Sequence, residues 1–60
     1  MSAGITDVYA ELCLFLGETN QFGFATRWDC VHYCVGYYGG VTAVHLSAIA
    51  MLEQNGMIKP

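Results

Sequence analysis

Residues 42–56 read TAVHLSAIAMLEQNG, and this stretch carries a complete helix signal with a start, an apolar stripe and a stop. Thr42 has a side chain of the kind that caps helix N-termini. Asn55 and Gly56 follow the last turn, and both readily adopt the left-handed conformation that ends a helix. The spacing predicts a stripe facing the core, formed by Leu46, Ile49 and Leu52, with His45 and Ala48 alongside.

A second helix is predicted just upstream, over about residues 26–38. Thr26 is its expected cap, Asp29 lies in its first turn, and the pair Gly39-Gly40 breaks the chain after it. Its i, i+3, i+4 rhythm predicts a core face formed by Trp28, Val31, Val35 and Tyr38.

A first helix is predicted over about residues 6–17. Thr6 is a candidate cap, Asp7 lies where the helix dipole favours an anion, and Gly17 is the candidate end. At about 100° per residue, one broad face carries Val8, Leu12, Phe15 and Leu16, with Tyr9 and Cys13 at its edge.

These windows predict a mainly α protein, a compact three-helix bundle that forms a single domain over residues 1–60. The pattern also leaves room for a minimal two-stranded β element between residues 22–25 and 57–59. A chain of this length buries only about 60% of its unfolded surface, so a dense core is needed. With 55% apolar residues, the sequence has the material for one.

Charge is scarce and mostly negative. Arg27 and Lys59 are the two basic residues, against five acidic ones, and the sequence pI is near 4.9. Proteins that bind DNA or RNA directly place many Lys and Arg side chains on phosphates, so direct nucleic-acid binding is not expected. An acidic balance favours a basic partner instead.

Three cysteines, Cys13, Cys30 and Cys34, fit a disulfide scaffold poorly because their number is odd. The chain starts with Met1, reads as a complete small open frame and shows no signal peptide, so reduced, buried thiols in a cytoplasmic protein are expected. Residues 30–52 lack charged side chains over a length that would span a membrane. Gly39-Gly40 and two histidines interrupt that run, so no membrane association is expected.

No catalytic, metal or cofactor site is predicted. Cys30 and Cys34 are separated by three residues, whereas a zinc knuckle has two between its cysteines, and His32 points to a different helix face. Pairing of any cysteine with His32 or His45 as a nucleophile and base has no distinguishing pattern. The glycines lack the spacing and the Lys of a phosphate loop. We therefore expect a protein that is not an enzyme.

The candidate partner-binding residues are acidic. Asp7, Glu11 and Glu18 fall within about 40° of one another on the first helix, opposite its apolar face. Asp29 and Glu53 are candidates to assist them. This pattern predicts binding to a protein partner with a basic, nucleic-acid-binding surface, by a monomer or weak dimer.

A different class of function remains open from the same sequence. A structural or regulatory subunit, or a homodimer, would associate through apolar and aromatic surface, with Tyr33, Tyr37 and Met51 as candidates. Salt distinguishes the two, because exposed charges are screened within about 8 Å at physiological ionic strength and apolar contacts are not.

Two resemblances accompany these interpretations. Residues 42–58 resemble the end of a winged-helix recognition helix, in which Leu-Glu is followed by Gly and an aliphatic pair. Here the helix lacks the basic residues of that family and the chain ends before a wing. As a small acidic chain without a catalytic motif, it also resembles phage-encoded anti-CRISPR inhibitors. That resemblance implies an inhibitor that binds a basic surface of a CRISPR effector subunit and blocks access of DNA.

Overall fold

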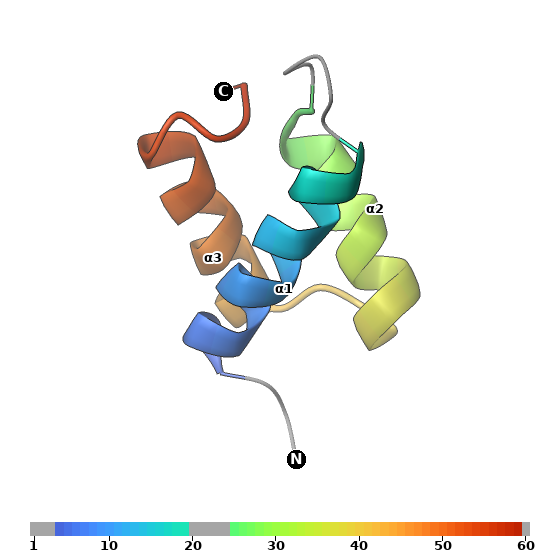
Figure 1. Ribbon diagram of the computed structural model, residues 1–60. Helices are drawn as coiled ribbons and strands as arrows, with labels where there is room; N and C mark the ends of the chain where they lie inside the picture. Colours follow the sequence, from blue (N-terminus) through green and yellow to red (C-terminus); the bar gives the residue numbers. More distant parts are fainter. Residues whose placement is uncertain (1–3, 20–24, 60) are drawn as a thin grey trace.

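A computed structural model of the chain describes residues 4–19 and 25–59, which form three helices (Figure 1). Helix α1 spans Ile5–Thr19, α2 spans Arg27–Tyr38 and α3 spans Ala43–Gln54. Both α1 and α2 pack against α3, whereas they touch each other much less. The mainly helical architecture expected from the sequence is therefore confirmed.

The start signals of α2 and α3 are the ones that the sequence indicates. At α2, the Thr26 backbone N–H donates to Oδ2 of Asp29 at 2.8 Å. At α3, the Thr42 backbone N–H donates to Nδ1 of His45 at 2.9 Å. Each bond satisfies a backbone donor that the first helical turn leaves without an intrahelical partner. His45 thus takes the position that Glu or Gln usually occupies in a capping box.

The predicted stops of α2 and α3 are also confirmed. Gly39 ends α2 with a φ of 80°, and Gly56 follows α3 with a φ of 73°. After α3, the Gly56 N–H donates to the Glu53 carbonyl and the Met57 N–H donates to the Leu52 carbonyl, at 3.1 and 3.0 Å. These two bonds form a Schellman motif, which turns the chain back toward the core.

Helix α1 continues past its predicted end. It begins at Ile5 and runs through Gly17 to Thr19, so Gly17 is not a stop. A glycine inside a helix costs only about 1 kcal/mol relative to alanine. Burial of Leu16 in the preceding position offsets a cost of that size.

Among residues 4–19 and 25–59, the buried apolar side chains form one cluster drawn from all three helices and the segment after α3. Its members are Val8, Leu12, Leu16, Cys30, Cys34, Ala48, Ile49, Leu52 and Ile58. The face predicted for α1 is confirmed, with Phe15 partly buried against the cluster. In α3, Ile49 and Leu52 are buried as predicted.

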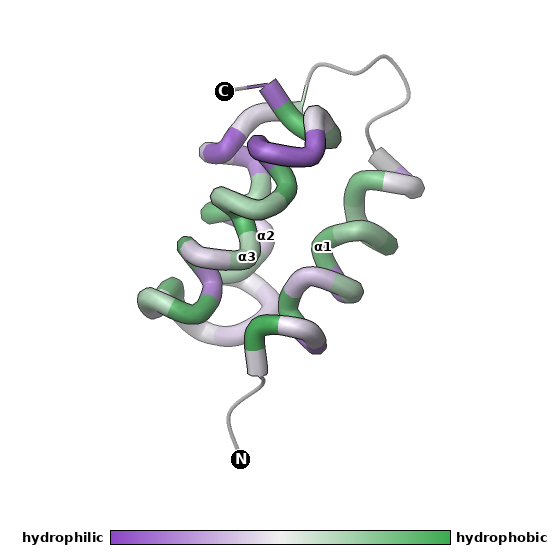
Figure 2. Tube along the Cα trace, turned by 90° about the vertical axis from the view of Figure 1, so that its left-hand side faces the viewer, coloured by the Kyte–Doolittle hydropathy of each residue, from purple (hydrophilic) through white to green (hydrophobic). Residues whose placement is uncertain are grey.

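Two predictions about the core are wrong. Trp28 and Val35 of α2 are 67% and 50% exposed, and the buried residues of that helix are Cys30 and Cys34. Leu46 of α3 is 47% exposed, whereas His45 is buried. Both helices carry apolar residues around most of their circumference, so periodicity alone does not select one face. Figure 2 shows apolar colour in several successive turns of α3.

The two-stranded element is not formed. The described residues between 25 and 59 contain one isolated parallel bridge, between Thr26 and Lys59, and no strand. The Lys59 N–H donates to the Ala25 carbonyl at 3.0 Å. Residues 22–24 of the predicted pair lie outside the described residues. The segment after α3 instead buries Ile58 and lies beside the start of α2.

Two glycines should respond to alanine with opposite signs. Gly56→Ala should lower the free energy of unfolding by about 1–2 kcal/mol, because a Cβ disfavours the left-handed backbone. Gly36→Ala, in the interior of α2 where a Cβ would meet nothing within 4 Å, should raise it by up to about 1 kcal/mol. Urea denaturation measures both. Equal effects of the two substitutions would contradict this account of the α3 stop.

Candidate functional site

The acidic residues of α1 lie in one stripe along the helix. Asp7, Glu11 and Glu18 all fall within Ile5–Thr19, and helical spacing keeps them within about 40° of one another. Leu14 lies in the same stripe and is 63% exposed. Leu14 is not among the residues predicted from the sequence to bind a partner, although the spacing 7, 11, 14, 18 is itself helical.

Glu11 connects this stripe to α2. The Tyr33 hydroxyl donates to Oε2 of Glu11 at 2.7 Å, and both side chains are partly buried. This hydrogen bond raises the pKa of the Tyr33 phenol well above its usual value, and burial acts in the same direction. A phenol that donates to a carboxylate resists losing its proton, because the phenolate would lose the bond and repel the carboxylate. Glu11 therefore helps to hold α1 against α2.

An aromatic row continues from Glu11 across α2 to the start of α3. It consists of Phe15, Tyr33, Tyr37, Tyr38 and His45. The rings of Phe15 and Tyr33 stack with centroids 4.4 Å apart, and Tyr33 stacks on Tyr37 at 5.4 Å. Tyr37 is 58% exposed, so the row is open to solvent at its centre.

Together these residues form a continuous surface over α1 and α2, which we call the acid–aromatic surface. It is defined by Asp7, Glu11, Leu14, Glu18, Tyr33 and Tyr37. Helix α1 contains no Lys or Arg, and Arg27, the one Lys or Arg of α2, pairs with Glu53 of α3. The surface therefore combines carboxylates with exposed apolar and aromatic groups and carries no basic side chain of its own.

The other two candidate acids lie elsewhere and have partners within the chain. Asp29 accepts the capping bond from Thr26 at the start of α2. Oε1 of Glu53 lies 2.8 Å from Nη2 of Arg27. The structure thus brings together three of the five predicted residues, Asp7, Glu11 and Glu18, and gives the other two structural contacts.

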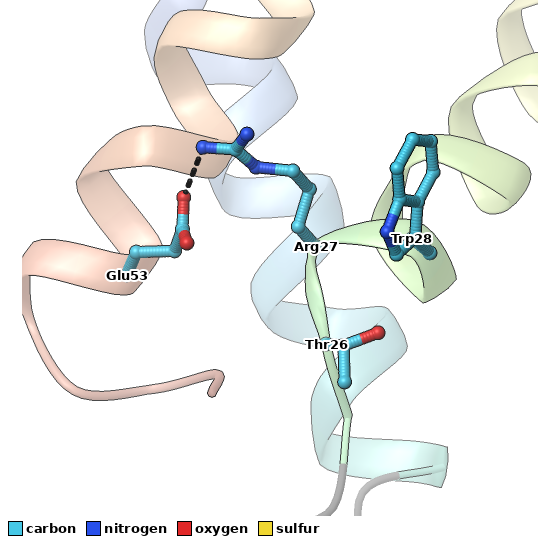
Figure 3. A pocket seen from close by; sticks show the side chains of 4 residues that line it. All are labelled: Thr26, Arg27, Trp28 and Glu53. Atoms are coloured by element: carbon cyan, nitrogen blue, oxygen red, sulfur yellow. Dashed lines mark hydrogen bonds and ion pairs between the residues drawn. The ribbon is translucent and has the colours of Figure 1, made fainter. Parts of the chain in front are cut away.

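The Arg27–Glu53 pair lines a shallow cleft of about 430 Å³ together with Thr26 and Trp28 (Figure 3). In this view the indole ring of Trp28 stands apart from the ion pair, on the far side of Arg27. The two charges of the cleft already neutralise each other. These four residues offer an aromatic surface and no nucleophile beside a general base.

The thiols are placed for packing. Burial raises the pKa of the Cys30 thiol to about 11, with the nearby Cys34, Asp29 and Glu53 acting in the same direction. Burial also raises the pKa of Cys34. Thiols protonated in this way are poor nucleophiles. Within residues 4–19 and 25–59, no group of three or more His, Cys, Asp or Glu side chains is arranged to hold a metal ion.

Across the part of the chain that the structure describes, each helix is too short or too polar to cross a membrane. Comparisons with protein-family models, with curated proteins and with solved structures found no match for this chain. The chemistry of the acid–aromatic surface is therefore the basis for a functional proposal.

The Tyr33–Glu11 hydrogen bond should contribute measurably to the free energy of unfolding. Tyr33→Phe should lower the free energy of unfolding at neutral pH by about 1–2 kcal/mol, because a hydrogen bond to a partly buried carboxylate is lost. The matched control is Tyr37→Phe, whose hydroxyl lies on an exposed ring, with an expected change within about 0.5 kcal/mol. If both variants unfold like the parent, the bond does not join α1 to α2.

The buried thiols should make stability depend on alkaline pH. The ordinary pKa of a cysteine thiol is 9.0, and burial raises the pKa of Cys30 in the folded chain to about 11. The folded-state pKa is the higher one, so the contribution is fully present below about pH 9 and is lost as pH rises to about 11. Cys30→Ala should therefore show a shallower decline of the unfolding free energy across this range.

The control for this measurement is Val8→Ala, which also removes buried apolar volume and has no titrating group. It should lower stability at every pH and keep the decline of the parent. A Cys30→Ala variant with the parent's slope would contradict the assignment of this pH dependence to the thiol.

Proposed function

We propose that this chain is a small acidic phage or mobile-element inhibitor, similar in action to the anti-CRISPR proteins, that works in the host cytoplasm without catalysis. It binds a basic, nucleic-acid-handling surface of a host defence complex and blocks access of DNA. The observation that carries the proposal is the acid–aromatic surface, on which the α1 carboxylates lie beside exposed Leu14 and Tyr37.

Electrostatics supports a basic partner. Asp7 and Glu18 are exposed and lie about 16 Å apart along α1, at 1.5 Å per residue. That distance equals the rise of roughly five nucleotides of a B-form strand at 3.4 Å each. A row of carboxylates on a rigid helix thus presents negative charge to a groove that otherwise holds phosphates. With a net charge of −3, the chain is also steered toward a positive groove.

The apolar part of the surface supplies binding free energy beyond that of the ion pairs. Exposed ion pairs contribute only about 0.2–1 kcal/mol each, so two or three of them do not hold a complex together. Leu14 and the ring of Tyr37 are exposed groups of the type that anchor interfaces. A guanidinium or ammonium group of the partner that reaches Glu11 also comes beside the Tyr33–Tyr37 stack, where a cation–π contact is available.

The test compares two double variants that raise the net charge by the same amount. Asp7→Asn with Glu18→Gln removes two charges from the surface and leaves the Glu11–Tyr33 bond in place. His32→Lys with Val35→Lys adds two charges at exposed positions on another side of α2. Each protein is immobilised, used to capture complexes from host lysate, and washed at about 0.15 M and about 1 M salt.

We expect the parent and the His32→Lys/Val35→Lys variant to retain a basic nucleic-acid-binding complex at low salt and release it at high salt. The Asp7→Asn/Glu18→Gln variant should bind roughly tenfold more weakly, as expected for the loss of about 1–2 kcal/mol. The captured complex should also lose DNA binding when the parent is added. If the two variants bind equally, or if high salt releases nothing, the acidic stripe is a solvated face and the proposal fails.

A further inference from the structure

The outer side of α3 carries no Asp, Glu, Lys or Arg side chain. Its residues are Ala43, Val44, Leu46, Ser47, Ala50 and Met51, and all of them are exposed or partly exposed. The one charged residue of the helix, Glu53, lies toward α2 and pairs with Arg27. In Figure 2, α3 lies nearest the viewer and most of its length is coloured apolar or near neutral.

Small side chains lie along the middle of this surface and larger ones lie on either side. At 100° per residue, the small side chains of Ala43, Ser47 and Ala50 form the central line, which ends at the larger, exposed Gln54 in the last turn. Val44 and Met51 lie together on one flank, one turn to either side of Ser47, and Leu46 lies on the opposite flank. A central line of small residues allows a second helix to approach closely, and the larger flanking side chains then pack around the contact.

We propose that this face of α3 binds the same face of a second copy of the chain, in an antiparallel, two-fold symmetric dimer. A two-fold axis midway between Val44 and Met51 brings Val44 of each copy level with Met51 of the other. The same axis interleaves the small residues, because Ser47 lies almost on it. A symmetric dimer requires a self-complementary patch, and this pattern supplies one.

The positions of the acidic residues favour a second copy of the chain over a charged partner. Each chain has a net charge of −3, so two copies repel each other unless their acids lie away from the contact. Asp7, Glu11 and Glu18 all belong to α1, and Asp29 caps α2. Glu53 borders the Leu46 flank of α3 and is paired with Arg27, so two such chains can approach through this side of α3 without juxtaposing unpaired carboxylates.

The size of the α3 face determines the affinity expected for the dimer. A 12-residue helix is about 18 Å long, so one helix face buries less than the roughly 800 Å² per partner of a standard interface. We expect a reversible dimer that forms at micromolar or higher concentration. This dimer leaves α1 uncovered and does not depend on the proposed inhibitor function.

The experiment uses a charge pair across the two-fold axis. Ser47→Glu and Ser47→Lys each place two like charges against each other in a homodimer, while the exposed position leaves the fold intact. Sedimentation equilibrium of the parent, at concentrations up to on the order of 1 mM, should show a species of twice the 6.6 kDa chain mass. Each variant alone should have a dissociation constant at least about tenfold higher, and an equimolar mixture of the two should dimerise again.

Val35→Glu is the matched control, because it adds the same charge at an exposed position of α2 and should dimerise like the parent. Circular dichroism of each variant confirms that the helices are retained. A parent that remains monomeric up to that concentration would overturn the proposal. So would a dimer that persists in Ser47→Glu, or a mixture of the two Ser47 variants that stays monomeric.

Discussion

The small thiols of Cys30 and Cys34 set the arrangement of the whole structure, because they are the side chains that α2 buries in the core beside α3. Two side chains of this size let the helix approach its neighbour closely, whereas Trp28 in the same place would hold the two apart. Once the thiols face the core, helical geometry fixes every other side chain of α2. Trp28 and Val35 then point to solvent.

The same rotation of α2 creates the acid–aromatic surface. It turns Tyr33 toward α1, where the phenol meets Glu11 and stacks on Phe15. Helices α1 and α2 share little direct packing, and among the described residues this hydrogen bond and this ring contact connect them. Glu11, which the helical spacing places in a stripe of acidic residues, therefore also has a structural role. Asp7 and Glu18 of the same stripe are exposed.

The two proposed contact surfaces use different chemistry on different helices. The surface on α1 and α2 joins carboxylates to exposed aromatic and aliphatic groups, which suits a basic partner and is sensitive to salt. The outer side of α3 is uncharged and self-complementary in size. The chain has only seven charged residues. Because three of the acids lie on α1, the outer side of α3 is left without a charged side chain.

Local sequence is sufficient to predict the three helices, the caps at Thr26 and Thr42 and the stops at Gly39 and Gly56. These are local features, set by side chains that hydrogen-bond to nearby backbone and by glycine's access to positive φ. It also placed three acids on one stripe of α1, since helical spacing needs no tertiary contact. The buried sides of α2 and α3, in contrast, depend on how the helices pack together. Where apolar residues surround a helix, periodicity permits several core faces, and the choice belongs to packing between residues distant in sequence.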